Sequence, residues 1–110
     1  MSRIYANKTD ANHAAIRDEL RVVLHDGVIH DCSSGHNGFP DLCIGWKGFN
    51  FLYEIKKKGG SRLTNSQVSF HQNWQGQAAV CRSATEVLAD MLREVHSRKC
   101  VARLQNYLAG

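Results

Sequence analysis

Two β-prone segments joined by a two-residue turn signal constrain the fold of this chain more than any other feature. Leu42–Trp46 and Phe49–Ile55 are rich in aliphatic and aromatic side chains, and Lys47-Gly48 separates them. Two such segments with a two-residue connection predict a β-hairpin, although Asn-Gly would be a stronger turn signal. A hairpin centred between Lys47 and Gly48 places Asp41, one residue before the first strand, directly opposite Glu54.

The predicted register brings two carboxylates together on one face of the hairpin. Residues directly opposite each other on paired strands have Cβ atoms about 4.5–5.5 Å apart. Lys56 joins Asp41 and Glu54 on that face because side chains alternate along a strand. One lysine does not balance two facing carboxylates, whereas a hard divalent cation bound by both, a backbone carbonyl and water does. The pattern therefore predicts a Mg²⁺ or Mn²⁺ site with Lys56 beside it.

The surrounding charge indicates the class of substrate. A bound divalent metal lowers the pKa of its water ligand and offsets negative charge on phosphorus oxygens, which suits phosphodiester hydrolysis. Lys57, Lys58 and Arg62 place further positive charge where a nucleic-acid backbone would run. The chain has 14 Lys and Arg against 10 Asp and Glu, and its net charge of +4 favours a polyanionic partner. We therefore expect a nucleic acid as the partner.

Length and composition indicate a single domain over residues 1–110. The 110 residues are 43% hydrophobic, which is enough for one core but not for two. No apolar run approaches the roughly 18 residues needed to span a bilayer, and the N-terminal residues lack the apolar stretch of a signal peptide. We expect a cytoplasmic chain with reduced cysteines, no membrane partner and no organic cofactor. We expect the core of the domain to cover about residues 10–90. Residues 91–110 should form a helical tail, which either continues the preceding helix as one long helix or forms a separate short helix.

Periodicity and end signals predict an α/β fold with the order α-β-β-β-α-β-α. Asp10 is the expected N-cap of the first helix and Gly27 its stop. Thr64-Asn-Ser-Gln67 and Ser83-Ala-Thr-Glu86 have the form of capping boxes that open the second and third helices. The predicted elements are helices over 10–26, from 64 to about 76 and from 83 onward, and strands over 28–32, 42–46, 49–55 and 78–81.

The motifs occur in an order that resembles a known nuclease family. They are Gly38-Phe-Pro-Asp41-Leu, Phe51-Leu-Tyr-Glu54-Ile-Lys56, Arg62-Leu-Thr, then Gln67, His71 and Trp74, and Gly76-Gln-Ala-Ala-Val-Cys81. Across roughly residues 10 to 90 the chain is similar to the virus-type replication-repair nuclease (VRR-NUC) family of the PD-(D/E)XK nuclease superfamily. The resemblance implies a restriction-endonuclease-like α/β core, divalent-metal-dependent DNA cleavage and, as in stand-alone phage-type members, homodimers resembling Holliday-junction resolvases.

By matching position, the resemblance also implies roles for individual residues. Asp41 and Glu54 correspond to metal ligands, and the Ile55 carbonyl corresponds to a third. Lys56 corresponds to the catalytic lysine, and Gln67 to the glutamine that opens the next helix. Gln67 is also the N3 residue of a capping box, and the two roles do not exclude each other.

The first helix departs from the superfamily pattern. Many members contribute an acidic residue from this helix, whereas here Ala15 falls near the matching position. Asn12 and Glu19 share one flank of the apolar stripe with Ala15, so either is a candidate to reach the site. The departure leaves the first-helix contribution and the number of metal ions open.

Three functions fit these features. The first is a structure-specific endonuclease that resolves branched DNA as a homodimer. The second is a nuclease-like module that binds junctions without cutting, which the missing first-helix acid favours. The third is a flap or restriction-type nuclease on linear DNA, although a chain this short has little room for a separate sequence-reading element.

Two other patterns are considered for function. Zinc-ligand residue types occur at His30, Cys32, His36 and Cys43, but their spacing matches no familiar zinc motif, and we expect the histidines to be loop or surface residues. An apolar stripe near the C-terminus indicates packing, either on the domain's own sheet or against a second copy. Its members are Val95, Val101, Leu104 and Leu108.

Overall fold

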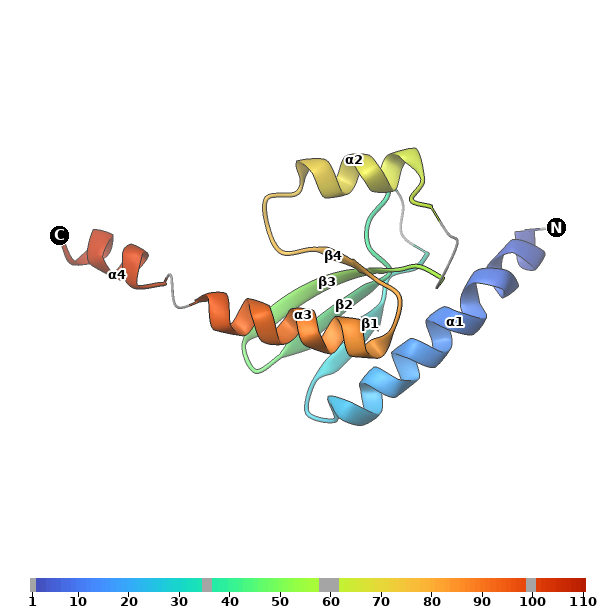
Figure 1. Cartoon of the computed structure of the whole chain (residues 1–110), viewed down its shortest axis with the longest axis horizontal. Helices are drawn as coiled ribbons and strands as arrows, with labels where there is room; N and C mark the ends of the chain where they lie inside the picture. The colour runs from blue at the N-terminus through green and yellow to red at the C-terminus, as the bar shows by residue number, and fades with distance from the viewer. Residues whose placement is uncertain (1, 35–36, 58–61, 99–100) are drawn as a thin grey trace.

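A four-stranded mixed sheet with helices around it forms an α/β domain (Figure 1). The computed structural model describes residues 2–34, 37–57, 62–98 and 101–110, with the backbone alone for 2–11 and 101–103. Its elements are α1 (Ser2–Val23), β1 (Val28–Asp31), β2 (Leu42–Trp46), β3 (Phe49–Ile55), α2 (Asn65–Asn73), β4 (Ala79–Cys81), α3 (Ala84–Ser97) and α4 (Val101–Ala109). The predicted order of elements is confirmed, and the tail contains a second short helix.

The central hairpin has the predicted strands and register. Leu42 lies opposite Tyr53, and the pairing continues to Trp46 opposite Phe49. The turn residues Lys47 and Gly48 have φ values of 48° and 83°. Positive φ at both central positions is the backbone of a two-residue turn whose twist matches that of the flanking strands. The local sequence therefore sets the spacing of the two strands and the face on which each side chain lies.

The strand order is β1-β2-β3-β4, with antiparallel pairing throughout the first three strands and parallel pairing of β4 with β3. A parallel neighbour requires a crossover connection, and α2 supplies it. Figure 1 shows α2 on the side of the sheet away from α1 and α3. One face of the sheet therefore supports the core, and the other faces α2.

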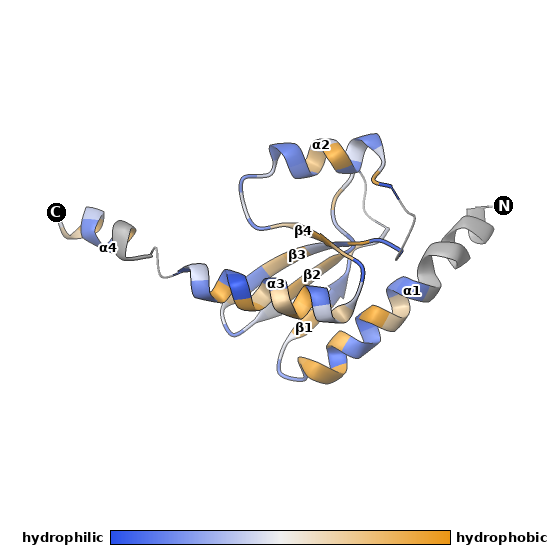
Figure 2. Cartoon of the chain, viewed as in Figure 1, coloured by the Kyte–Doolittle hydropathy of each residue, from blue (hydrophilic) through white to orange (hydrophobic). Residues whose placement is uncertain are grey.

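The hydrophobic core lies between the sheet and two helices. Alternating residues of β2 and β3 point to α1 and α3, whose apolar faces close over them. Figure 2 shows apolar and polar residues alternating along both helices. The main core residues are Ile16, Leu20, Leu42, Ile44, Phe51, Tyr53, Val87 and Met91. Met91 packs in this core, so α3 continues across the expected boundary between core and tail.

The predicted start of the first helix is wrong. The helix begins at Ser2, and Asp10 lies inside it rather than at its N-cap. No proline or glycine interrupts the segment before Gly27, and an aspartate within a helix carries only a small free-energy penalty. The C-terminal signal is correct, because the chain leaves α1 through a turn in which the Gly27 N–H donates to the Leu24 carbonyl at 2.9 Å. Within the described ranges, no helix is long and apolar enough to cross a membrane.

The second predicted capping box forms only in part. The Glu86 N–H donates to Ser83 Oγ at 3.1 Å, as expected for an N-cap serine. The Glu86 carboxylate, however, accepts from the N–H of Arg82 at 2.9 Å, one residue before the cap. The Glu86 side chain therefore binds the N–H of the residue before the N-cap, instead of the N–H of Ser83 as in a standard capping box.

Candidate active site

The hairpin register places Asp41 beside Glu54, as the sequence predicted. Asp41 lies one residue before β2, and its Oδ2 accepts a hydrogen bond from the Ile55 N–H at 2.9 Å. Glu54 is only 2% exposed. Burial, the negative charge of Asp41 and a hydrogen bond with that carboxyl group raise the pKa of Glu54 to about 8, and Lys56 opposes the rise only in part.

Glu54 has partners on one of its two oxygens. Oε2 accepts a hydrogen bond from Gln67 Nε2 at 2.9 Å and lies 3.9 Å from Lys56 Nζ. Oε1 is buried, and no described residue donates to it. A buried acceptor without a donor is unfavourable, so this oxygen is available to a proton or a cation.

Gln67 links the start of α2 to this pair of carboxylates. Its Oε1 accepts from the Thr64 N–H at 2.9 Å, and its own N–H donates to Thr64 Oγ1 at 3.2 Å. Its remaining polar group, Nε2, holds Glu54. The predicted capping box is therefore confirmed, and one side chain both caps the helix and contacts the site.

A close backbone approach positions the first turn of α2. Gly38 has a φ of 79°, and a Cβ at this position would overlap the Ser66 carbonyl and crowd the Gln67 N–H. Only glycine allows the loop before Asp41 to pass so close to the helix. The loop and α2 are therefore packed backbone against backbone beside the site.

We expect Gly38→Ala to destabilise the protein by about 3 kcal/mol, because left-handed backbone strain adds to a steric overlap. Urea unfolding measures the change. Gly48→Ala is the matched control: its φ of 83° is similar, but no atom lies within 4 Å of the added Cβ. The control should lose only about 1 kcal/mol. Equal losses in the two variants would contradict the proposed packing.

The first helix brings a histidine, rather than an acid, to this end of the sheet. Asn12 is partly buried and Glu19 is exposed, whereas His13 is only 3% exposed. His13 Nε2 lies 3.9 Å from Asp31 Oδ2 and has no hydrogen-bond partner among the described residues. Among the described residues, the side-chain contacts of Asp41 and Glu54 come from Ile55, Gln67 and Lys56, and none comes from α1.

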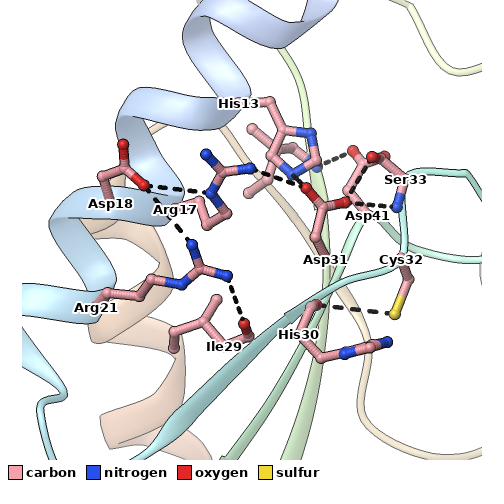
Figure 3. Close-up of polar contacts among 11 residues, drawn as sticks. His13, Arg17, Asp18, Arg21, Ile29, His30, Asp31, Cys32, Ser33 and Asp41 are labelled. Atoms are coloured by element: carbon pink, nitrogen blue, oxygen red, sulfur yellow. Dashed lines mark hydrogen bonds and ion pairs between the residues drawn. The ribbon is translucent and has the colours of Figure 1, made fainter.

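His13 belongs to a polar cluster around Asp31 that the sequence alone did not reveal (Figure 3). Asp31 accepts hydrogen bonds from Arg17 Nη1 at 3.1 Å and from the Ser33 N–H at 2.9 Å. Burial favours the neutral acid, but the hydrogen bonds from Ser33, with the His13 and Arg17 interactions, outweigh it and lower the pKa of Asp31 to about 2. A cavity of about 300 Å³ lies among these side chains and Ala14. The helical position of Arg17 and the strand-end position of Asp31 are ordinary surface patterns, so no local signal connects them.

The structure describes two of the three predicted nucleic-acid-binding residues. Lys57 and Arg62 are exposed, and Lys58 lies outside the described residues. Lys56 differs from Lys57, because only 14% of its side chain is exposed and its ammonium group faces Glu54. Neighbouring lysines therefore have different surroundings, one at the carboxylates and one in solvent.

The described residues among those considered for zinc do not form a metal-binding group. In the part of the chain that the structure describes, no three His, Cys, Asp or Glu side chains form a metal-binding group, and His36 lies outside that part. The described cysteines, Cys32, Cys43 and Cys81, are free thiols. At the predicted magnesium site the structure brings together two carboxyl groups, those of Asp41 and Glu54.

Comparisons with known proteins supply no family for the chain. No family model matches it, and neither the curated proteins nor the solved structures contain a significant match. The function therefore has to be argued from the site itself.

Proposed function

We propose that this chain is a divalent-metal-dependent endodeoxyribonuclease with a PD-(D/E)XK-type core similar to the VRR-NUC family. One observation carries the proposal: Glu54 is buried against Asp41 with an acceptor oxygen that no described residue satisfies, and Lys56 is the adjacent cation. With both carboxyl groups ionised such an arrangement is unfavourable without a cation, and perturbed carboxyl groups of this kind are characteristic of functional sites. The order of elements and the strand register support the same fold type.

The residues present fit a hard divalent cation. Mg²⁺ and Mn²⁺ prefer oxygen ligands, and Asp41, Glu54 and the Ile55 carbonyl would supply them. A cation held by these residues would offset the repulsion between the two carboxylates. When bound, the metal lowers the pKa of a coordinated water and stabilises the charge that develops on the phosphate.

The chain's own residues complete the proposed reaction. Lys56, held at Glu54, orients the attacking water or stabilises the non-bridging phosphate oxygens. Gln67 keeps the Glu54 carboxylate in place through its Nε2–Oε2 hydrogen bond. Lys57, Lys58 and Arg62 bind the phosphate backbone on either side. Water attacks phosphorus and the 3′-oxygen leaves, which yields a 5′-phosphate and a 3′-hydroxyl.

Branched DNA is the proposed substrate, cut by a homodimer. A four-way junction presents two equivalent strands for cleavage, and two copies of one small domain match that symmetry. A domain of this size also offers little surface for reading base sequence. Recognition of DNA shape and backbone is therefore favoured over recognition of sequence.

The test is cleavage of a labelled four-way junction beside a splayed arm, a flap and a linear duplex, each with Mg²⁺, with Mn²⁺ and with EDTA. We expect paired nicks in the junction that require the metal. Cutting of flaps or linear ends instead would keep the active site and replace the substrate. Binding without cutting in either metal would favour the junction-binding module, which the absence of an α1 acid at the described site supports.

A further inference from the structure

An apolar groove lies on the α3 side of the domain, away from the carboxylates. It has a volume of about 140 Å³, and all its lining residues are apolar: Leu24, Trp46, Leu88, Met91, Leu92 and Val95. Four of them lie on α3 at the spacing i, i+3, i+4 and i+7, which is the pattern of one helix face. Leu92 is 60% exposed. The groove is therefore an apolar hollow beside one helix face, large enough to take an apolar side chain from another element.

The C-terminal helix α4 has an apolar face with no cover. Leu104 is 66% exposed, Tyr107 is 83% exposed and Leu108 is 82% exposed. These residues lie at i, i+3 and i+4 and so share one face. A nine-residue helix is too short to be stable in water without packing. The helix and the exposed face therefore require a surface to pack against.

The connection between α3 and α4 favours a surface on another molecule. Arg98 is the C-cap of α3, and its guanidinium lies over the Phe49 ring at 5.0 Å from the ring centroid. Only residues 99 and 100 then separate Arg98 from α4, the lower limit for a turn between antiparallel helices. Short hinge connections favour exchange of an element between copies. Figure 1 shows α4 outside the rest of the fold, beyond the end of α3.

We propose that two copies of this chain exchange α4, so that the Leu104–Leu108 face of each copy occupies the α3 groove of the other. The two seats are related by a two-fold axis and are therefore equivalent. Two such helices and their grooves bury on the order of 1,500 Å² in total, which is within the range of stable dimers. The exchange rests on the homodimer of the proposed function and names its interface, and its test measures molecular mass rather than cleavage, so the nuclease activity can fail separately.

The test is the mass of the full chain by size-exclusion chromatography with light scattering across a dilution series. We expect the wild type to be a dimer, and Leu92→Glu in the groove and Leu108→Glu on α4 each to give monomers. Val22→Glu is the matched control, because Val22 is 76% exposed on α1 and outside the groove. It should leave the dimer intact. A monomeric wild type, or equal dissociation by Val22→Glu, would overturn the proposal.

Mixing the two monomeric variants separates exchange from other contacts. The Leu92→Glu chain keeps a normal α4, and the Leu108→Glu chain keeps a normal groove, so one of the two seats is complete in the mixed pair. We expect the mixture to recover part of the dimer, whereas each variant alone stays monomeric. Failure to recover any dimer would show that α4 does not occupy the partner's groove. Circular dichroism of each variant checks that the domain is folded.

Discussion

If the chain cleaves DNA as proposed, we expect Lys56→Met to lower the rate of metal-dependent cleavage by about 100- to 1,000-fold, because it removes a positioned positive group from the reacting phosphate. Methionine keeps most of the length of the side chain, which is 86% buried and faces Glu54. DNA affinity should change little, because the exposed basic residues still contact the backbone. Single-turnover cleavage and a gel-shift titration measure the two quantities on the same junction. Full cleavage by the purified variant would exclude Lys56 from the proposed chemistry.

Lys57→Met is the matched control for this experiment. Lys57 is the next residue along the chain, but its side chain is exposed. Its removal should weaken DNA binding, reduce the salt dependence of binding by about one phosphate contact and leave the saturated cleavage rate unchanged. The two neighbouring lysines should thus separate binding from catalysis.

Glu54→Gln stabilises the metal-free protein at high pH. The folded-state pKa of Glu54 is raised from 4.5 to about 8 by burial and by Asp41. Between these values the folded protein retains a proton that the unfolded chain has released, so wild-type stability falls as the pH rises through this interval. Glutamine has no charge to bury, and its amide group can donate to Asp41. The advantage of the variant should therefore be small near pH 4.5 and reach roughly 3–5 kcal/mol above pH 8.

Urea unfolding of the metal-free protein from pH 3 to 9 measures this difference. Asp31→Asn supplies a control of opposite sign, because the pKa of Asp31 is lowered to about 2. Asp31 stabilises the fold above its unfolded-state pKa, and that stabilisation is lost as the pH falls toward 2. The Asn variant should thus be less stable than the wild type at neutral pH. A constant offset between Glu54→Gln and the wild type at every pH would mean that Glu54 is not the titrating group.

The features predicted correctly from the sequence are those that local rules determine. The two-residue turn at Lys47-Gly48 sets the register, and the register alone brings Asp41 to Glu54. The capping box at the start of α2 is also local, so the position of Gln67 followed from a four-residue pattern. The positions of Asp41, Glu54 and Gln67 therefore follow from a turn and a helix cap.

The errors and omissions involve competition between weak signals or contacts between distant segments. Asp10 failed as an N-cap because one capping preference competes with the helix propensity of the whole preceding segment. The cluster of His13 and Asp31 joins residues from α1 and the end of β1, and no periodicity relates those two positions. The α3 groove likewise depends on how three elements pack. Such features need the three-dimensional arrangement.

Gln67 both caps α2 and holds Glu54, so the proposed active site is complete only while the first turn of α2 is folded. None of the nine residues of α2, all of which the structure describes, is buried, so this helix is among the elements expected to open first in native-state fluctuations. When its first turn unwinds, Glu54 loses its amide partner in the same event. The observed turnover is then the turnover of the intact site multiplied by the fraction of molecules in which α2 is docked. The same holds for any enzyme whose competent state is partly populated. DNA that contacts α2 would raise that fraction, so the substrate itself would complete the site that cuts it.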